Sequence, residues 1–358
     1  MKTMNKIYKE NISDKLMDLF FGCGYKQYKM SKFEEYGLYA ENRSFLPSKS
    51  IITFTDTDGR LMALKPDVTL SIVKNSRDGE DYKLYYNESV YRTDRNTNTF
   101  AEITQTGLEY IGCLDTARLS EVLTIAQLSL DTVSDDTVLD ISHLGILSSL
   151  LDRLGVSGED RKALLGFIEN KNCHDAVSLC KCKGADDNGC KLLYDFMTLD
   201  PDPDKACEIL KTYDVSDSFA AFVADFSSVL SSLDKSKLRV DFSVLNDTSY
   251  YNGIVFRGYV KGVPSAVLSG GQYDMLMRRM GKKSSAVGFA VYLDRLDDLC
   301  VKNAYPIYDV CILYDEKTSP SALCELIRKT VSDGKTYTAQ KCADNVKYSE
   351  LFDLRCGK

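Results

Sequence analysis

Arg92, Gln105 and Glu109 form the pattern with the clearest chemical content in this chain. Arg92 ends a segment rich in Tyr and Val, and Gln105, Gly107 and Glu109 alternate along the segment that follows. Alternate residues of a strand share a face, so the amide and the carboxylate should point together, with Gly107 leaving room for a small ligand. A guanidinium binds carboxylate or phosphate groups. The pattern therefore predicts a site for a small ligand with an anionic group.

The elements that must position these residues read as antiparallel strands with flanking helices. Residues 83–92 and 102–112 predict a strand and its returning partner, joined by a polar loop. Residues 51–65 alternate around Asp58-Gly59, which predicts a second hairpin. Further strands are expected at 137–141, 238–244, 250–260 and 265–268. Apolar periodicity predicts a helix that stops before Gly22 and helices that cover 119–130, 144–154 and about 272–280. Residues 286–289 should lead into a last helix that ends at 299.

The chain also changes character along its length, which indicates its domain organisation. Residues 156 to about 235 show helical periodicity with almost no strand pattern, so we expect a helical insertion there. The strands around it belong to one α+β domain over 1–300. After Pro306 an apolar strand at 308–314 and a helix at 321–331 begin a short α/β segment over 305–358, which is too short for a full α/β domain.

Composition narrows the function classes. The chain has 358 residues, 44% hydrophobic and 27% charged, which is ordinary for a soluble globular protein. A net charge of -7 argues against nonspecific nucleic-acid binding. The N-terminal residues lack the apolar core of a signal peptide, and no run reaches the length of a membrane span. Twelve cysteines without an export signal favour reduced thiols and a cytoplasmic protein.

Several ordered segments resemble the catalytic domain of histidyl-tRNA synthetase, a class II synthetase fold. They are LKPDVT at 64–69, YRTDR at 91–95, QTGLE at 105–109, YYNGIVF at 250–256, GGQYD at 270–274 and AVGFA at 286–290, followed by LDRL at 293–296. The resemblance implies an antiparallel sheet flanked by helices. It also implies a histidine-binding pocket, whose residues would be Asp67, Thr69, Arg92, Gln105, Glu109, Tyr250 and Tyr251. Arg295 matches the motif 3 arginine that would hold a nucleotide phosphate, either as a functional contact or as a relic of that site with a packing role.

The departures from that pattern fall on the activation chemistry. Asn246 stands where the synthetase tyrosine segment begins with arginine, Ala101 replaces the second arginine of motif 2, and Ser31 replaces the motif 1 proline. Adenylation needs positive charge at the α-phosphate, and one lost donor of this kind costs roughly 2.7–4 kcal/mol. The C-terminal segment is also too short to grip an anticodon. The resemblance therefore predicts that the amino-acid pocket is retained and that the groups that activate the amino acid are absent.

This combination resembles the regulatory subunits of ATP phosphoribosyltransferase, which are synthetase paralogues. The resemblance implies a noncatalytic protein without a cofactor. It would activate a short catalytic subunit in the first step of histidine biosynthesis and transmit feedback by histidine. A homodimer within a hetero-oligomer is expected. Two alternatives remain open: a divergent histidyl-tRNA synthetase that activates histidine with ATP, and a free-standing histidine-binding module.

Several of these residues also have plain structural interpretations. Asp67 and Thr69 could cap the helix after Pro66. Gln105 and Glu109 could lie on a solvent face, and Arg92 could pair with Glu88 or Asp94. A regular strand would point Tyr250 and Tyr251 to opposite faces, one into the core and one into the pocket.

Other conspicuous residues carry little chemistry in sequence. Gly270-Gly271 lacks the spacing of a dinucleotide fingerprint and fits close backbone approach instead. The spacing of Cys173, His174, Cys180, Cys182 and Cys190 matches no zinc motif, so no metal site is expected. His143 fits a core or helix-start position.

Overall fold

The computed structural model describes residues 2–43, 46, 51–93, 99–245, 251–296, 307–343 and 346–355. The chain divides into two compact units, one formed by residues 12–296 and the other by residues 1–11 together with 297–358. Each unit is described by itself below. Within the described residues, no helix combines the length and the apolar character that crossing a bilayer requires.

An eight-stranded sheet forms the centre of the larger unit, in the order β1-β5-β6-β11-β10-β9-β7-β8. Its pairs are antiparallel except at the two ends, where β1 pairs with β5 and β7 with β8 in parallel. The strands are β1 (Lys26–Gln27), β5 (Tyr82–Thr93), β6 (Phe100–Gly112), β7 (Thr137–His143), β8 (Leu238–Val240), β9 (Ile254–Val260), β10 (Leu268–Gln272) and β11 (Ser285–Tyr292). The expected pair at 83–92 and 102–112 is confirmed by β5 and β6.

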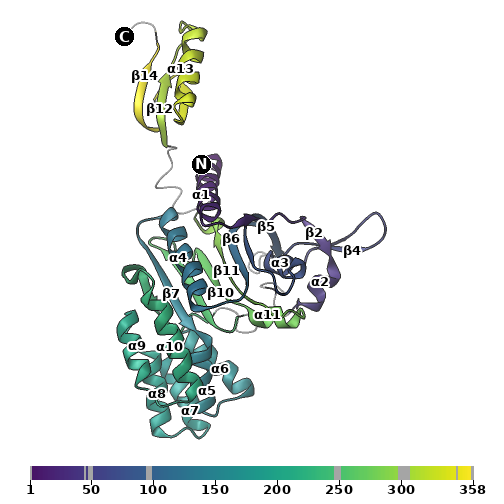
Figure 1. Cartoon of the computed structure of the whole chain (residues 1–358), viewed down its shortest axis with the longest axis vertical. Helices are drawn as coiled ribbons and strands as arrows, with labels where there is room; N and C mark the ends of the chain where they lie inside the picture. Colours follow the sequence, from purple (N-terminus) through teal and green to yellow (C-terminus); the bar gives the residue numbers. More distant parts are fainter. Residues whose placement is uncertain are drawn as a thin grey trace. The chain divides into compact units, whose positions relative to one another are not determined.

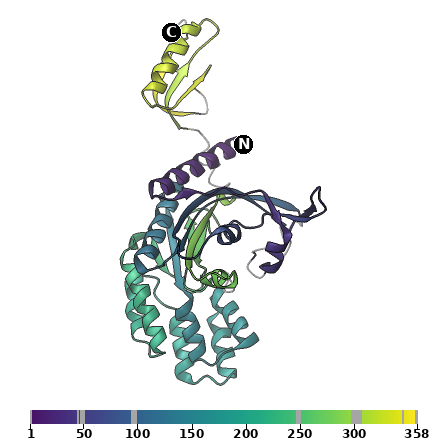
Figure 2. The same ribbon diagram turned by 45° about the vertical axis from the view of Figure 1, so that its right-hand side comes forward.

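Helices cover both faces of this sheet. On one face lie residues 12–22 of α1 (Lys2–Gly22), through Phe20 against Phe289, and α4 (Thr116–Val133), whose Leu130 fills the space above Gly258. On the other face α3 (Thr69–Asn75) and α11 (Asp274–Arg279) share one buried apolar cluster with Tyr86 and Val90 of β5. Figure 2 shows the strong curvature of the sheet, with α3 inside the curve. Side chains of the inner face that no helix covers are left to line a cavity.

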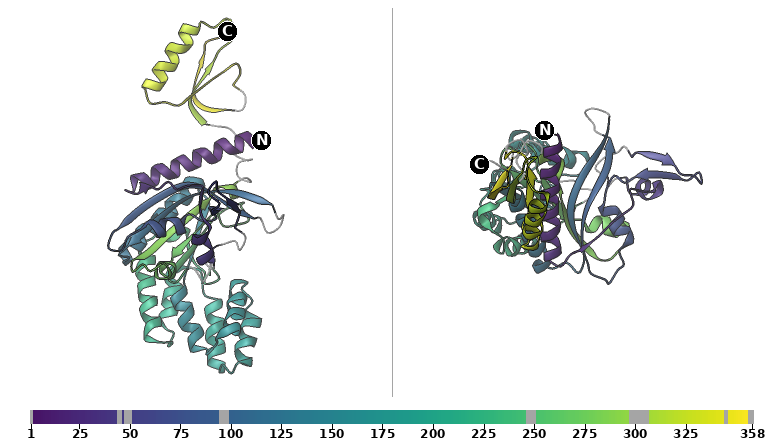
Figure 3. Two further views of the ribbon diagram at one scale, coloured as in Figure 1. Left: turned by 90° about the vertical axis from the view of Figure 1, so that its right-hand side faces the viewer. Right: turned by 90° about the horizontal axis from the view of Figure 1, so that it is seen from above.

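The helical insertion is present as expected. Its helices gather into one group (Figures 1 and 3), and four of them begin at Asn, Asp or Ser residues whose side chains accept a hydrogen bond from the first turn. The insertion follows α5 (Leu144–Arg153) and comprises α6 (Gly158–Glu169), α7 (Cys173–Cys182), α8 (Asp187–Met197), α9 (Pro203–Lys211) and α10 (Asp217–Ser231). A 3₁₀ turn, η2 (Lys235–Lys237), leads back to β8.

A small antiparallel sheet of order β2-β4-β3 precedes α3. It contains β2 (Phe33–Glu35), β3 (Thr53–Thr55) and β4 (Leu61–Leu64), and α2 (Tyr36–Glu41) follows β2. The hairpin predicted around Asp58-Gly59 is confirmed by the pairing of β3 with β4. Gly59 has a φ of 81°, a conformation that suits glycine in a tight turn.

Two predicted segments are wrong near the end of the larger unit. The strand expected at 265–268 is β10 at Leu268–Gln272, so Gly270 and Gly271 lie inside a central strand rather than after it. A Cβ at position 270 would lie 2.5 Å from the Cβ of Phe289, which explains why glycine occurs there. Residues 286–289 lead not into a helix but continue as β11 to Tyr292, followed by the 3₁₀ turn η3 (Leu293–Leu296).

The smaller unit contains a three-stranded parallel sheet of order β13-β12-β14 with α13 against it (Figure 3). The expected strand and helix are present as β12 (Ile307–Leu313) and α13 (Pro320–Ser332). Two further strands, β13 (Tyr337–Gln340) and β14 (Lys347–Asp353), were not predicted. Every residue of β14 is exposed, so its sequence lacks the apolar run that marks a buried strand.

Candidate functional site

A cavity of about 510 Å³ opens on the inner face of the central sheet. Residues paired directly across five neighbouring strands form one row of this face, in the order Tyr86, Gly107, Ala290, Ser269 and Arg257, and all of them except Gly107 line the cavity. The Tyr86 ring lies over Gly107, so the open part of this row runs from Ala290 past Ser269 to the guanidinium of Arg257. Strands lie about 4.8 Å apart, so this part is roughly 10 Å wide between β11 and β9.

Most of the predicted site residues line this one cavity, although they come from separate parts of the sequence. They are Asp67, Thr69, Arg92, Gln105, Glu109, Tyr251 and Arg295. Tyr250 and Asn246 lie outside the described residues. Tyr251 precedes β9 instead of lying in a strand, so the expectation of alternating tyrosine faces does not apply to it. Tyr251 also packs against the apolar cluster of α3.

Asp67 and Thr69 reach the cavity from the start of α3. The Oδ1 atom of Asp67 accepts a hydrogen bond from the Leu70 amide at 2.9 Å, so the helix-capping interpretation of this residue is correct. Thr69 instead donates its hydroxyl to Oε1 of Glu109 at 2.8 Å. Burial raises the pKa of the Asp67 carboxyl, and the Leu70 amide and the Arg92 guanidinium oppose that shift. Asp67 therefore both caps α3 and faces the cavity.

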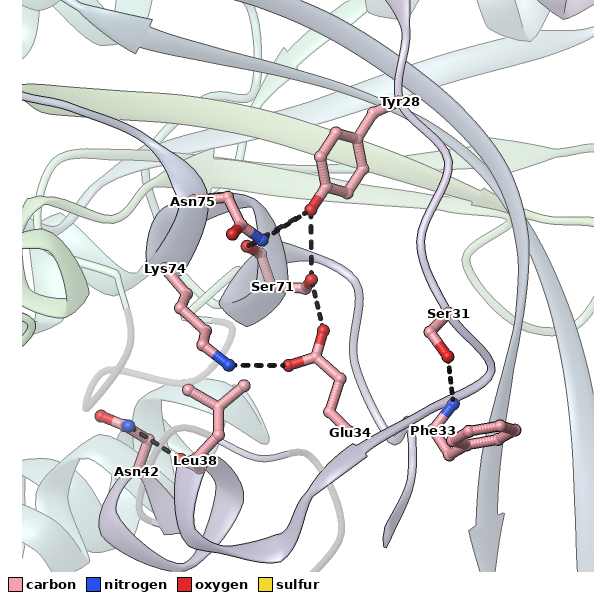
Figure 4. A network of polar contacts seen from close by, with 9 residues as sticks. All are labelled: Tyr28, Ser31, Phe33, Glu34, Leu38, Asn42, Ser71, Lys74 and Asn75. Carbon is pink, nitrogen blue, oxygen red and sulfur yellow. Dashed lines mark hydrogen bonds and ion pairs between the residues drawn. The ribbon is translucent and has the colours of Figure 1, made fainter. Parts of the chain in front are cut away.

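The next turn of α3 is fixed by a polar network (Figure 4). The Tyr28 hydroxyl lies 3.2 Å from Oγ of Ser71 and accepts a hydrogen bond from Asn75 at 3.0 Å. Ser71 donates to Glu34 at 2.7 Å, and Lys74 pairs with the same carboxylate at 3.4 Å. These contacts hold α3 to the segment around β2, so the positions of Asp67 and Thr69 depend on residues outside the cavity.

Glu109 is the most deeply buried carboxylate of the cavity, with 3% of its surface exposed. Thr69 donates to one of its oxygens, and Tyr273 donates to the other at 2.6 Å. Burial raises the pKa of the Glu109 carboxyl to about 8, and the two hydroxyl donors reduce that rise. A cationic ligand group placed beside Glu109 would favour its ionised form, so this carboxylate is suited to an ammonium or an imidazolium.

The predicted role of Gly107 is wrong. A Cβ at this position would overlap the Tyr86 ring and lie 2.7 Å from the Phe289 carbonyl oxygen. Tyr86 is the direct partner of Gly107 across the β5–β6 pair, and its ring already fills the space that was expected to receive a ligand. Gly107 therefore admits a tyrosine wall of the cavity, and the ligand space lies further along the floor.

Two residues essential to the geometry of Glu109 received no role from the sequence. Gly288 pairs with Glu109 across β6 and β11, and a Cβ there would overlap Oε2 of Glu109. Tyr273 supplies the second hydroxyl donor. Both residues lie within segments that carry the synthetase resemblance, at 286–290 and 270–274. Their place in these segments was the one sequence signal that could have assigned them to the site. Their contacts with Glu109 join positions more than 160 residues apart, which periodicity cannot reveal.

Three guanidinium groups line the cavity, each with a different protein partner. Arg92 donates from Nε to the Pro66 carbonyl at 2.9 Å. Arg295 donates to the Ala266 carbonyl, and its guanidinium carbon lies 4.3 Å from the Tyr292 ring centroid. Arg257, which the sequence did not single out, lies 3.7 Å from Glu169 of the insertion. The cavity thus combines the buried carboxyl groups of Glu109 and Asp67 with cations elsewhere on its wall.

An ion pair between Arg92 and Glu88 was one of the alternatives, and within the described residues Glu88 instead pairs with the buried Lys65. Asp94, the other alternative partner of Arg92, lies outside the described residues. The carboxylate of Glu88 also accepts from the Met30 amide at 3.4 Å. This arrangement fixes the segment that carries Pro66 and Asp67 and leaves Arg92 facing the cavity.

The remaining candidates lie away from the cavity. Across the parts of the chain that the structure describes, no three His, Cys, Asp or Glu side chains approach closely enough to hold a metal ion. His143 caps α5 as one of its interpretations predicted, because its Nδ1 accepts from the Gly145 amide at 3.1 Å. The ten cysteines among the described residues are free thiols.

Comparison with known proteins agrees with this fold and cavity. The sequence profile of the family described as histidyl-tRNA synthetase matches residues 4–296. The ATP phosphoribosyltransferase regulatory subunit of Caldanaerobacter subterraneus subsp. tengcongensis is 30% identical, over 97% of this chain and 95% of that protein.

Two solved structures share the fold. One is an ATP phosphoribosyltransferase regulatory subunit/histidyl-tRNA synthetase from Bacillus halodurans, with a TM-score of 0.74 and 22% identity over 98% of this chain and 94% of that chain. The other is a chain from the ATP phosphoribosyl transferase (HisG:HisZ) complex of Thermotoga maritima, with a TM-score of 0.63 and 20% identity over 80% and 97%. The expected class II synthetase-like fold is confirmed. The chain therefore belongs to the histidyl-tRNA synthetase family and, within it, to the regulatory subunits of ATP phosphoribosyltransferase.

Proposed function

We propose that this chain is the noncatalytic regulatory subunit of an ATP phosphoribosyltransferase. In this role it is needed for activity of a short catalytic subunit and transmits feedback inhibition by histidine in the first step of histidine biosynthesis. The observation that carries the proposal is one cavity that unites buried Asp67 and Glu109 with Arg92, in a chain 30% identical to a protein named as such a subunit.

The charge distribution of the cavity suits histidine. Glu109 and Asp67 can accept from an α-ammonium or an imidazole, and Gln105 can both donate and accept. Arg92 can pair with the α-carboxylate, since a guanidinium matches carboxylate geometry. Thr69 orients Glu109 through its hydroxyl, and Tyr251 supplies an aromatic wall. Tyr250 is the remaining candidate contact.

The expected absence of catalysis rests on groups that adenylation would need. Ala101 replaces the second arginine of motif 2 and pairs directly with Arg92 across β5 and β6, so its methyl group supplies no charge there. Arg295 is engaged by the Ala266 carbonyl and the Tyr292 ring, which supports a packing role for this relic of a nucleotide site. Transition-state stabilisation of a phosphoryl group depends on such cations.

The partners follow from the same proposal. The short-form catalytic subunit is the protein partner and histidine is the effector. The chain forms a homodimer within a larger hetero-oligomer and works in the cytoplasm, without binding nucleic acid or membrane. A chain from such a complex shares its fold, and the net charge of -7 supports a function without nucleic acid.

Reconstitution tests the proposal. The short catalytic subunit should turn over slowly by itself and faster with this chain, and histidine should suppress the stimulated rate. Glu109→Gln should keep the stimulation while weakening suppression by histidine at least tenfold, because it removes the charge that faces the ligand cation. Stimulation that histidine leaves unchanged in the unsubstituted complex would refute the feedback role.

A divergent histidyl-tRNA synthetase is the second candidate, and one observation favours it. Arg257 lines the same cavity as Arg92 and Arg295, and so offers a cation from outside the motifs. This candidate predicts histidine-dependent exchange of pyrophosphate into ATP and salt-sensitive tRNA binding. We expect no exchange from the purified chain, and clear exchange that Arg257→Gln abolishes would decide for the synthetase.

A further inference from the structure

Arg257 links the cavity to the helical insertion. Its place on the floor of the cavity is set by pairing, because Arg257 lies across from Ser269, which in turn lies across from Ala290. Its Nη2 atom lies 3.7 Å from Oε1 of Glu169 in α6. The two side chains are 26% and 49% exposed, so this is a long ion pair in contact with solvent.

Glu169 occupies an unusual place for an acidic side chain. It is the last residue of α6, where the helix dipole disfavours negative charge. The turn that follows is anchored next to the sheet by a second ion pair of opposite sense, in which Lys171 contacts Asp241, the residue after β8, at 2.6 Å. Lys171 has a φ of 54°, which fixes the path of the chain away from α6. The end of α6 is thus attached at two points, one of which lies on the ligand cavity.

We propose that Arg257 joins Arg92 in recognising the α-carboxylate of the ligand, and that Arg257 gives up its contact with Glu169 when that carboxylate fills the cavity. The inference rests on the proposed binding of histidine. It adds a residue that determines ligand specificity and a contact through which binding in the cavity affects the helical insertion. Loss of the Arg257 contact leaves the Glu169 carboxylate at the negative end of α6 without this ion pair. The last turn of α6 is then destabilised, while the Lys171–Asp241 pair keeps the insertion attached.

The strengths of the two ion pairs make this exchange feasible. An exposed pair of this kind contributes only about 0–1 kcal/mol, which corresponds to at most about a fivefold change in an equilibrium constant. A ligand carboxylate held within hydrogen-bonding distance of the Arg257 guanidinium forms a charge-assisted hydrogen bond, whereas the Glu169 carboxylate at 3.7 Å is too distant for one. The contact at Asp241 is shorter and is supported by Ser243, so it should persist.

Hydrogen exchange and calorimetry on the full chain can test the inference. The amides to follow are those of residues 168–172, with L-histidine and L-histidinol as ligands, because histidinol carries an alcohol in place of the carboxylate. Histidine should speed exchange in this segment severalfold, and histidinol should not. Glu169→Gln should bind histidine roughly two- to fivefold more tightly, because the competing carboxylate is gone. Glu159→Gln, which removes the same charge from the first turn of α6, should behave like the unsubstituted chain.

Arg257→Gln adds a test of specificity. It should weaken histidine binding about tenfold or more and leave histidinol binding nearly unchanged. If Arg257→Gln fails to fold, the exposed Glu169 variant still tests the exchange. Equal effects of Glu169→Gln and Glu159→Gln, or equal responses to both ligands, would overturn this inference while leaving the proposed function intact. No histidine binding by the unsubstituted chain would overturn both.

Discussion

Gly288 lies directly across from Glu109, and the missing side chain at position 288 creates the space that the buried carboxylate occupies. A Cβ there would overlap Oε2 of Glu109 and lie 2.6 Å from the Leu108 carbonyl oxygen. The backbone of a central strand cannot shift without disturbing its pairing with both neighbours, so an added Cβ would displace the Glu109 carboxylate instead. The geometry of the candidate site thus depends on a residue that itself offers no functional group.

Gly288→Ala should therefore remove histidine binding and destabilise the fold by about 1–3 kcal/mol through overpacking. Calorimetric titration and urea unfolding would measure the two effects. Gly166→Ala is the matched control, because position 166 lies inside α6 with nothing within 4 Å of its added Cβ. That control should be neutral or slightly stabilising. Unchanged histidine affinity in Gly288→Ala would mean that Glu109 does not contact the ligand.

Histidine binding should become tighter as pH rises from about 7 to 8.5. The pKa of the Glu109 carboxyl is raised to about 8 in the free chain, so a cation that needs the ionised form must displace a proton at neutral pH. Affinity should rise by up to about tenfold per pH unit below that pKa. Calorimetry in buffers of different ionisation enthalpy should show proton release on binding, and Glu109→Gln should abolish it. Proton uptake would contradict this assignment.

The Glu109 carboxyl also makes the stability of the folded chain depend on pH, in a direction that follows from its raised pKa. The pKa of the Glu109 carboxyl is raised from the ordinary value of 4.5 to about 8 in the folded chain. Between pH 4.5 and 8 the folded chain therefore holds a proton on Glu109 that the unfolded chain has lost. This contribution is complete below about pH 4.5 and is lost as pH rises through about 8. Relative to the unsubstituted chain, Glu109→Gln should therefore gain stability between pH 5 and 9, by roughly 1.4 kcal/mol for each unit of the pKa shift at most. A constant difference in urea midpoints over this range would contradict it.

The ion pair between buried Lys65 and half-buried Glu88 should lose more stability when one partner is replaced than when both are. Lys65 is 1% exposed, and its side chain contacts the Glu88 carboxylate. Glu88→Ala would leave a buried charge unpaired, at a cost of about 3–5 kcal/mol. The double variant Lys65→Met with Glu88→Leu should recover most of that loss. Asp195→Ala breaks an exposed pair with Lys191 and should change stability by less than about 1 kcal/mol.

Much of the fold could be predicted because its signals are local. The alternation that led to Gln105 and Glu109 also defines β6, and the polar residues before the insertion helices cap them as their types predict. The glycines show where local reasoning ends. Gly107 was interpreted as space for a ligand, yet the space belongs to Tyr86 on the neighbouring strand. Gly270 and Gly271 were placed after the strand expected at 265–268, but both lie inside β10, although glycine usually weakens a strand.

The candidate site was predicted in the same uneven way. Asp67, Arg92 and Glu109 are charged residues within recognisable motifs, so the sequence indicated that they contact a ligand. Tyr273 and Arg257 are ordinary strand-end and strand residues in sequence, and only the pairing of distant strands brings them to the cavity. The order of strands β6, β11, β10 and β9 does not follow the order of the sequence. Contacts across such a sheet are set by topology, which composition and periodicity do not encode.

His143 should make the chain less stable as pH falls. Its Nδ1 accepts from the Gly145 amide, its ring lies 5.1 Å from Phe222, and burial lowers the pKa of its imidazole to about 4. Because the unfolded chain binds a proton near pH 6.5 and the folded chain does not, this stabilisation is present above pH 6.5 and lost as pH falls toward 4. The loss is roughly 1.4 kcal/mol per pH unit within that window.

His143→Asn isolates this contribution, because asparagine caps a helix without titrating. Urea unfolding between pH 7 and 4 should show the unsubstituted chain losing stability relative to His143→Asn, with a gap that widens as pH falls. His174 is the other histidine of the chain and is exposed, so His174→Asn should follow the unsubstituted profile. Parallel profiles for the His143 variant and the unsubstituted chain would mean that the folded state accepts the proton on His143 without cost.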